Sequence, residues 1–229
     1  MIVLDGCSGA GGAARGYADA GHTVYGIDIR PELEHDYLKS GVSGFLEADI
    51  LEALAAPWIA KADFIHVSPP CQFYSAMAAC RPGLAQRYPN LIGPVRELLN
   101  ATGKPWVIEN VEAAAPWMKD PVRLCAQMFR PGVLLYRHRL FETGGGFRLA
   151  APPRPPEGSC GRRGECGWPH PVPASRAGHW VPGTAISVAG HVGNVALARQ
   201  VMEIGWTTRD ELGEAIPPYY TEWIGRQLS

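Results

Sequence analysis

Each of several short apolar runs in this sequence is followed by a polar residue that could serve in catalysis or ligand binding. Residues 2–4, 23–27 and 64–67 have the length and composition of buried strands, and segments with helical periodicity separate them. Strands that alternate with helices form parallel βαβ units, whose right-handed crossovers bring the carboxyl ends of the strands to one edge of a sheet. The pattern therefore predicts an α/β fold with its ligand site at that edge.

The polar residues at the predicted strand ends are Asp5, Asp28, Asp49, Cys71 and Glu109. Cys71 follows two prolines, and Glu109 closes the run 106–108, so a thiol and a carboxylate form a candidate nucleophile and acid pair. A thiolate at Cys71 would have to form against a free pKa of about 8.5. A proton-donating Glu109 has the opposite need, a pKa raised by burial or by nearby negative charge.

A glycine-rich turn at residues 5–12 joins the first strand to a helix predicted over 13–20, and its backbone can approach a ligand closely. The alternative is a tight turn made only for packing. Asp28 is placed to accept hydrogen bonds from ribose hydroxyls. The turn and Asp28 together favour an adenosine-containing cofactor. Asp49 could receive an adenine amino group, could cap the helix that starts at Ile50, or both.

The remaining pattern divides the chain of 229 residues into three parts: a catalytic core at 1–141, a loop-rich insert at 142–194, and C-terminal helices at 195–229 that return to the core. Further helices are predicted over 31–39, 50–60 with an interruption at Pro57, 91–100, 195–204 and 219–228. Thr208 and Glu211 have the spacing of a capping box.

Charge and composition limit the class of protein. The net charge of −1 excludes a polycation, but residues 121–180 carry +6, which indicates a face for phosphates or, alternatively, a loop of solvated arginines. No apolar run approaches the ~20 residues that span a bilayer. The first residues indicate a strand and not a signal peptide, so we expect a cytoplasmic protein whose six cysteines are thiols, ligands or a nucleophile.

Several short motifs follow one another along the chain in an order that resembles one known protein family. Residues 5–12 read Asp-x-x-x-Gly-x-Gly-Gly, and Pro-Cys-Gln, Glu-Asn-Val and Arg-His-Arg follow at 70–72, 109–111 and 137–139. With Asp28, Asp49 and the final Ala-Ile-Pro-Pro at 215–218, this series resembles the DNA (cytosine-5) methyltransferases, most of all their short phage-encoded members. The resemblance implies a Rossmann-like methyltransferase fold, S-adenosylmethionine as cofactor and DNA as substrate.

The resemblance also implies a covalent mechanism. Cys71 would attack carbon 6 of a flipped-out cytosine, and Glu109 would hydrogen-bond the ring near nitrogen 3. Arg139 would contact the ring carbonyl, with Arg137 supporting it or holding a phosphate. The residues that would bind the cofactor are Asp5, Cys7, Ser8, Gly9, Gly11, Gly12, Asp28, Ile29, Asp49, Ile50, Pro70 and Glu214.

The sequence departs from the family pattern at two positions. Cys7 stands where the family commonly has an aromatic that stacks on adenine, so Ile29 or Ile50 would supply that packing. Glu214 replaces an asparagine near the last motif, and we expect it to face the amino-acid end of the cofactor. The short recognition region makes a partner subunit conceivable. Two alternatives stay open: the same chemistry on RNA or with another donated group, and a non-catalytic nucleic-acid-binding protein.

The insert holds two further groups of candidate residues. Cys160, Cys166, His170 and His179 are chemically suited to zinc, although their spacing does not match a tight knuckle, and the alternative is that they are incidental. The candidate DNA contacts are Arg154, Arg162, Arg163, Arg176, Trp168 and Trp180.

Overall fold

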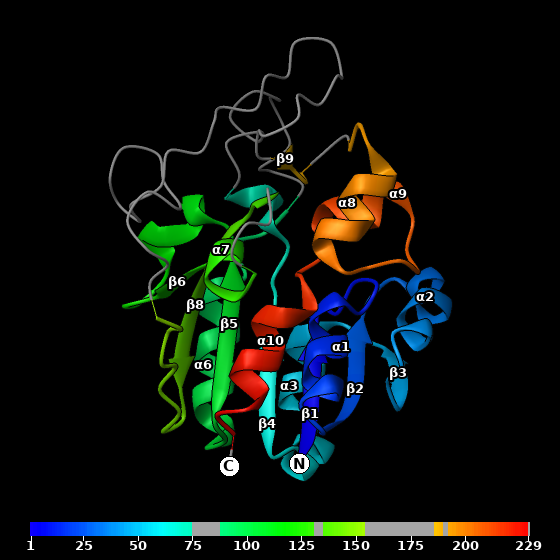
Figure 1. The fold of residues 1–229 in the computed structure, drawn as a ribbon. Coiled ribbons are helices and arrows are strands. Elements are labelled where there is room, and N and C mark those ends of the chain that lie inside the picture. Colours follow the sequence, from blue (N-terminus) through cyan, green and yellow to red (C-terminus); the bar gives the residue numbers. More distant parts are fainter. Residues whose placement is uncertain (75–87, 131–134, 154–185, 190–191, 229) are drawn as a thin grey trace.

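A seven-stranded sheet forms the centre of the structure, a computed structural model that describes residues 1–74, 88–130, 135–153, 186–189 and 192–228 (Figure 1). The strand order is β3-β2-β1-β4-β5-β8-β6. Its strands are β1 (Ile2–Gly6), β2 (Thr23–Asp28), β3 (Gly44–Glu47), β4 (Phe64–Val67), β5 (Trp106–Asn110), β6 (Val122–Cys125) and β8 (His138–Gly144). A second, two-stranded sheet pairs β7 (Leu135–Tyr136) with β9 (Ile186–Ser187).

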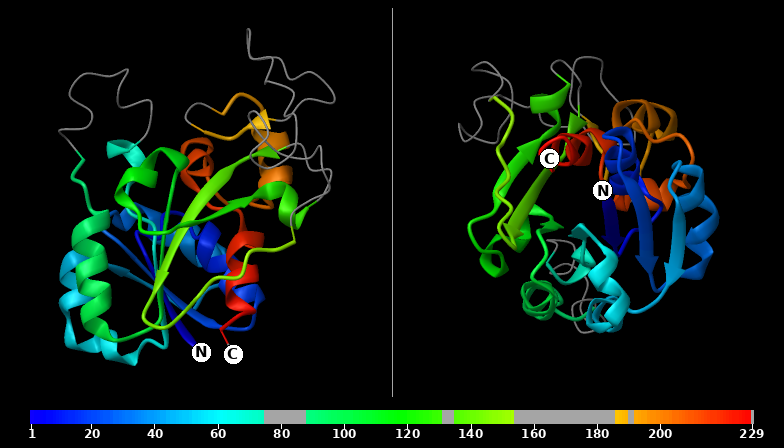
Figure 2. Two further views of the ribbon diagram at one scale, coloured as in Figure 1. Left: turned by 90° about the vertical axis from the view of Figure 1, so that its left-hand side faces the viewer. Right: turned by 90° about the horizontal axis from the view of Figure 1, so that it is seen from below.

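Helices cover both faces of the central sheet, as the view from below shows (Figure 2). On one face lie α1 (Gly12–Asp19), α8 (Val195–Met202), α9 (Arg209–Glu214) and α10 (Pro218–Gly225). The other face is covered by α3 (Ile50–Ala55), η2 (Pro57–Lys61) and α6 (Ile92–Thr102). Neighbouring strand residues such as Val3 and Leu4 belong to the two different cores, because side chains alternate across a strand.

The predicted elements form close to where the sequence placed them. Asp49 caps α3, and Pro31 opens η1 (Pro31–Leu33), which leads into α2 (Glu34–Lys39). The capping box at Thr208 and Glu211 begins α9. Short turns of helix not predicted from the sequence are η3 (Cys71–Phe73), η4 (Glu112–Trp117) and α7 (Ala126–Phe129).

The sheet is not wholly parallel, which departs from the prediction. The sequence pattern did not reveal β6 and β8, and β8 runs antiparallel to both β5 and β6. Strand β8 also crosses the predicted boundary between residues 141 and 142, where Glu142 is buried in an ion pair with Arg96. The glycines that follow form a packed turn, since a Cβ on Gly145 would lie 1.8 Å from the Lys104 carbonyl oxygen.

Part of the predicted insert lies outside the described residues. This holds for the four candidate zinc ligands and for the candidate DNA contacts named with them.

Cys125 is disulfide-bonded, which departs from the expectation of unpaired cysteines. Among the helices of the described ranges, none combines the length and the apolar character needed to cross a bilayer.

Candidate active site

A pocket of about 300 Å³ lies beyond the carboxyl ends of β1, β2, β4 and β5. Of the residues predicted to act together, it is lined by Asp5, Cys7, Ser8, Gly9, Gly12, Asp28, Ile29, Asp49, Ile50, Pro70, Cys71, Glu109, Arg139 and Glu214. Gly11 and Arg137 are outside this lining. Parallel strands account for the convergence, because they deliver their carboxyl ends to the same edge.

Cys71 begins the short helix η3, directly after the two prolines. The side-chain amide of Asn110 donates to the Pro69 carbonyl at 2.9 Å, and its oxygen accepts from the Val111 amide at 2.9 Å. Asn110 thereby ties the Pro-Pro turn to the end of β5. Burial raises the pKa of the Cys71 thiol, and Arg139 is the strongest influence in the opposite direction. The resting group is therefore a thiol with a cation beside it.

Glu109 and Arg139 form a buried ion pair, with 2.9 Å between Oε1 and Nε. Glu109 lies inside β5, one residue before its end, and not beyond it. Antiparallel β8 places Phe141 opposite Glu109, which puts Arg139 just past the end of β5. Burial raises the pKa of the Glu109 carboxyl, and Arg139 and then Arg137 only partly offset that rise. A carboxyl in this state can donate a proton.

Arg137 is buried, and backbone carbonyls take up its guanidinium. It donates to the carbonyls of Val188 and Ala215, and to that of Gly213 at 3.1 Å. Burial lowers its pKa to about 9, with Arg139 adding to the effect. These bonds support the strand that carries Arg139, and a contact of Arg137 with a phosphate stays a prediction.

The acids at the other end of the pocket already have protein partners. Asp28 accepts from the Gly9 amide at 3.0 Å and from the backbone and side chain of Arg30 at 3.1 and 3.3 Å. Asp49 caps α3 through the amides of Leu51 and Glu52, at 2.8 and 3.3 Å. The capping role of Asp49 is thus confirmed, and contact with an adenine remains a prediction.

Asp5 is fully buried in the wall of the pocket. Burial raises the pKa of its carboxyl well above the usual range, and the negative charge of Asp28 adds to the rise. Neither carboxyl oxygen makes a hydrogen bond of good geometry among the described residues, although the Ala14 amide and the Tyr37 hydroxyl lie near enough to moderate that pKa. Buried oxygens that lack partners are consistent with a pocket that receives hydrogen-bond donors from a ligand.

Cys7 and the two isoleucines occupy different positions around the glycine-rich turn. Cys7 has a positive φ of 54°, and burial raises the pKa of its thiol. Ile50 is buried, and its Cδ1 atom packs so closely against Gly6 that a Cβ added to this glycine would lie 2.5 Å from it. Ile29 is 65% exposed at the rim. Both isoleucines line the pocket, so their role in packing against an adenine stays a prediction.

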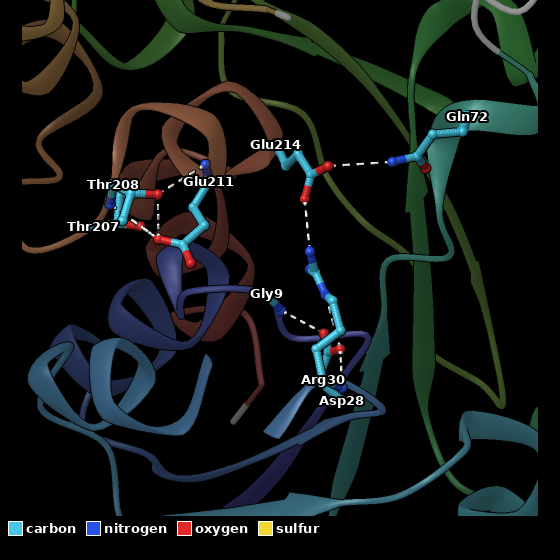
Figure 3. A network of polar contacts seen from close by, with 8 residues as sticks. All are labelled: Gly9, Asp28, Arg30, Gln72, Thr207, Thr208, Glu211 and Glu214. Atoms are coloured by element: carbon cyan, nitrogen blue, oxygen red, sulfur yellow. Dashed lines mark hydrogen bonds and ion pairs between the residues drawn. The ribbon is translucent and has the colours of Figure 1, made fainter. Parts of the chain in front are cut away.

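The structure adds Arg30 to the site, which the sequence argument did not single out. Figure 3 shows its side chain extending from Asp28 to Glu214, whose Oε2 lies 3.3 Å from Arg30 Nη1. Glu214 Oε1 accepts from the Gln72 amide at 3.2 Å. This chain of contacts crosses from the end of β2 to the residue after Cys71. Arg30 lies two residues after Asp28, an acid at a predicted strand end, and this position was the signal in the sequence that could have identified it.

Comparison with known proteins gives structural matches alone: no family model and no curated protein matches the sequence. A prophage-encoded protein of E. coli, assigned provisionally as a DNA modification methyltransferase, is 14% identical with a TM-score of 0.62, over 100% of this chain and 98% of that one. A mutant of Spodoptera frugiperda DNMT2 is 14% identical with a TM-score of 0.57, over 100% and 99%. Entamoeba histolytica methyltransferase EhMeth is 11% identical with a TM-score of 0.62, over 100% and 97%.

These matches extend over the whole chain, whereas the sequence identities are low, so they establish the fold. The resemblance inferred from the motifs is confirmed at that level, including the likeness to a phage-encoded member. The chain has a Rossmann-like fold, which it shares with these methyltransferases.

Proposed function

We propose that this protein transfers a methyl group from S-adenosylmethionine to carbon 5 of cytosine in DNA, through a covalent adduct at Cys71. The observation that carries the proposal is the convergence of Cys71, Glu109 and Arg139 on one pocket. Asp28 and Asp49 line the same pocket, as expected for a nucleoside-binding end. A protein that only bound nucleic acid would have no need for a thiol beside this acid and this cation.

The residues of the pocket fit the cofactor. A volume of about 300 Å³ is at the lower end of the range for small-molecule sites. Asp28, Asp49 and Glu214 line it and give surroundings suited to a positively charged sulfonium. The under-bonded oxygens of Asp5 could accept hydrogen bonds from a ligand. When bound, S-adenosylmethionine supplies an electrophilic methyl group.

The protein residues make carbon 5 reactive. The Cys71 thiol gives its proton to solvent, and the thiolate adds to carbon 6 while nitrogen 3 takes the proton of Glu109, so the ring gains one bond to sulfur and one proton. Arg139 holds the Glu109 carboxyl and offers its donors to the ring carbonyl. Carbon 5 then accepts the methyl group and loses its proton to solvent. Release of the thiolate, its reprotonation by solvent and return of the nitrogen 3 proton to Glu109 restore the site.

The depth of the site determines how the base must arrive. Glu109 is only 5% exposed, so a cytosine within a duplex could not reach it and would have to be flipped out of the stack. Surfaces that recognise the flanking DNA would come from residues 142–194, with or without a partner subunit, and most of that segment lies outside the described residues.

Covalent trapping tests the proposal. DNA with 5-fluorocytosine in place of every cytosine has no proton to lose at carbon 5, so with cofactor it should leave the protein cross-linked. The adduct should disappear in Cys71→Ala, which removes the attacking thiol. The absence of an adduct with DNA would contradict the proposal.

The same assay separates the alternatives. An adduct on 5-fluorocytosine RNA but not on DNA would favour the RNA substrate. Retained binding with no adduct on either nucleic acid would favour the non-catalytic protein. Mass spectrometry of nucleosides from modified normal DNA identifies the donated group, and a mass gain other than that of a methyl group would favour another donor.

A further inference from the structure

A chain of buried hydrogen bonds lies behind Glu109 and has no part in the chemistry described so far. The Tyr17 hydroxyl lies 2.9 Å from His66 Nδ1, and His66 Nε2 lies 2.8 Å from the Ser68 hydroxyl. Tyr17 and His66 are fully buried. A histidine in the middle of a short apolar strand is costly unless both ring nitrogens have partners, and here both do.

Strand register brings this chain to the catalytic acid. Strands β4 and β5 are parallel, with Val67 beside Ile108, so Ser68 comes beside Glu109 at the next position. His66 lies two residues before Ser68 and therefore points to the same face of the sheet. Ser68 and Glu109 both line the pocket, and the Ser68 hydroxyl lies near enough to the Glu109 carboxyl to lower its pKa. The chain of hydrogen bonds thus runs from α1, through β4, to Ser68, which lies beside the acid.

The directions of these hydrogen bonds follow from the protonation of the imidazole. Burial lowers the pKa of His66 to about 3, so the ring is neutral at physiological pH and carries one N–H. If Tyr17 donates to Nδ1, that N–H is on Nε2 and donates to Ser68. The Ser68 hydroxyl is then free to donate to an ionised Glu109. In this arrangement the hydroxyl of Tyr17, the N–H of His66 and the hydroxyl of Ser68 each donate one hydrogen bond.

We propose that Tyr17, His66 and Ser68 form a hydrogen-bond relay that positions the Glu109 carboxyl. Arg139 holds one side of that carboxyl through Oε1, and Ser68 holds it from the neighbouring strand. A contact on each side would determine the plane of the carboxyl, which the ion pair with Arg139 alone leaves free to turn, since no hydrogen bond of good geometry holds Oε1 among the described residues. The relay residues are positioning residues, and their assignment rests on the proposed role of Glu109.

The test follows the titration of Glu109 by NMR in protein labelled with [¹³C]glutamate, with Glu109→Gln identifying its signal. Ser68→Ala should raise the pKa of Glu109 by roughly 0.5–1 unit, because the ionised form loses a hydrogen bond. Tyr17→Phe should raise it by less, through a weakened His66–Ser68 bond. The other titratable or charged groups around Glu109 are Asp5, Cys71, Arg137, Arg139 and Tyr220, and the variants leave them in place.

Tyr219→Phe is the matched control, since it removes a buried hydroxyl that bonds the Val201 carbonyl at 3.3 Å, outside the relay. An unchanged pKa of Glu109 in Ser68→Ala would overturn the relay. So would a Tyr17→Phe shift no larger than that of Tyr219→Phe. The NMR titration does not depend on methyl transfer. A protein without methyltransferase activity would contradict the proposed function, but the pKa of Glu109 in each variant could still be measured and compared.

Discussion

Arg137 holds the backbone on both sides of Glu214. Its guanidinium donates to the carbonyl of Gly213 at 3.1 Å and to that of Ala215. Arg137 lies only two residues before Arg139, which is paired with Glu109. The strand that carries Arg139 is therefore tied directly to the segment that carries Glu214.

We expect Arg137→Met to destabilise the fold by roughly 2–4 kcal/mol, because it leaves buried carbonyls without their charged donor. Urea unfolding monitored by circular dichroism measures the change. Arg15→Met is the control, since it removes an exposed ion pair with Asp19 and should cost less than about 1 kcal/mol. Equal losses in the two variants would show that the Arg137 contacts contribute little.

The positions of Asp28 and Asp49 at the pocket could be predicted from the sequence because they follow from the local pattern. Asp28 and Asp49 each come at or just after a strand whose apolar run is evident, and parallel pairing does the rest. Arg139 is different. Its place beside Glu109 depends on the antiparallel strand β8, whose sequence shows neither strict alternation nor a continuous apolar run.

Contacts between segments far apart in the sequence could not be predicted from local patterns either. Arg30 and Glu214 are 184 residues apart, and nothing in either local pattern indicates that they meet. The sequence places His66 in the short apolar run 64–67, and a strand pattern does not reveal that the Tyr17 hydroxyl contacts its ring. Such pairings depend on how helices pack against the sheet, which local periodicity does not specify.

The close approach of α1 and α10 gives a prediction about packing. A Cβ on Gly16 would lie 2.0 Å from the Pro218 carbonyl oxygen, so Gly16→Ala must push the helices apart. We expect a loss of roughly 1–3 kcal/mol in the free energy of unfolding. Gly93 in α6 has nothing within 4 Å but precedes Pro94, which disfavours helical conformation for a residue with a Cβ, so Gly93→Ala should change the free energy of unfolding less than Gly16→Ala does. Thermal or urea unfolding of both variants gives the comparison, and a neutral Gly16→Ala would contradict it.

The acid Glu112 gives a prediction about pH. Burial alone would raise its pKa, but hydrogen bonds and charges from His138 and Arg123 outweigh burial and lower it to about 2. A carboxyl with a lowered folded-state pKa stabilises the fold above its unfolded pKa of about 4.3, and that contribution is lost as the pH falls toward 2.

Glu112→Gln should therefore reduce the free energy of unfolding by roughly 1 kcal/mol at pH 7, a small value because the side chain is partly exposed to solvent. At pH 2 the difference from the original protein should nearly vanish. Urea unfolding at a series of pH values measures both. A difference that stayed constant down to pH 2 would show that the Glu112 charge is not the cause.

Glu214 gives the prediction closest to function. It pairs with Arg30 at 3.3 Å, and the two side chains are 46% and 40% exposed, so the ion pair is weak and a charged ligand could replace it at little cost. If Glu214 faces the amino-acid end of the cofactor, its carboxylate would meet the ammonium group there. Glu214→Gln should then weaken the binding of S-adenosylhomocysteine about tenfold, the loss expected for one charge-assisted hydrogen bond.

Isothermal titration calorimetry with two ligands makes that assignment specific. 5′-Methylthioadenosine lacks the amino-acid end, so its affinity should be the same in Glu214→Gln as in the original protein. Glu203→Gln removes an equally exposed acid, paired with Arg130 away from the pocket, and should change neither affinity. If Glu214→Gln weakened both ligands equally, the acid would act on the nucleoside end or on the shape of the pocket. Unchanged binding of both would remove Glu214 from the cofactor site.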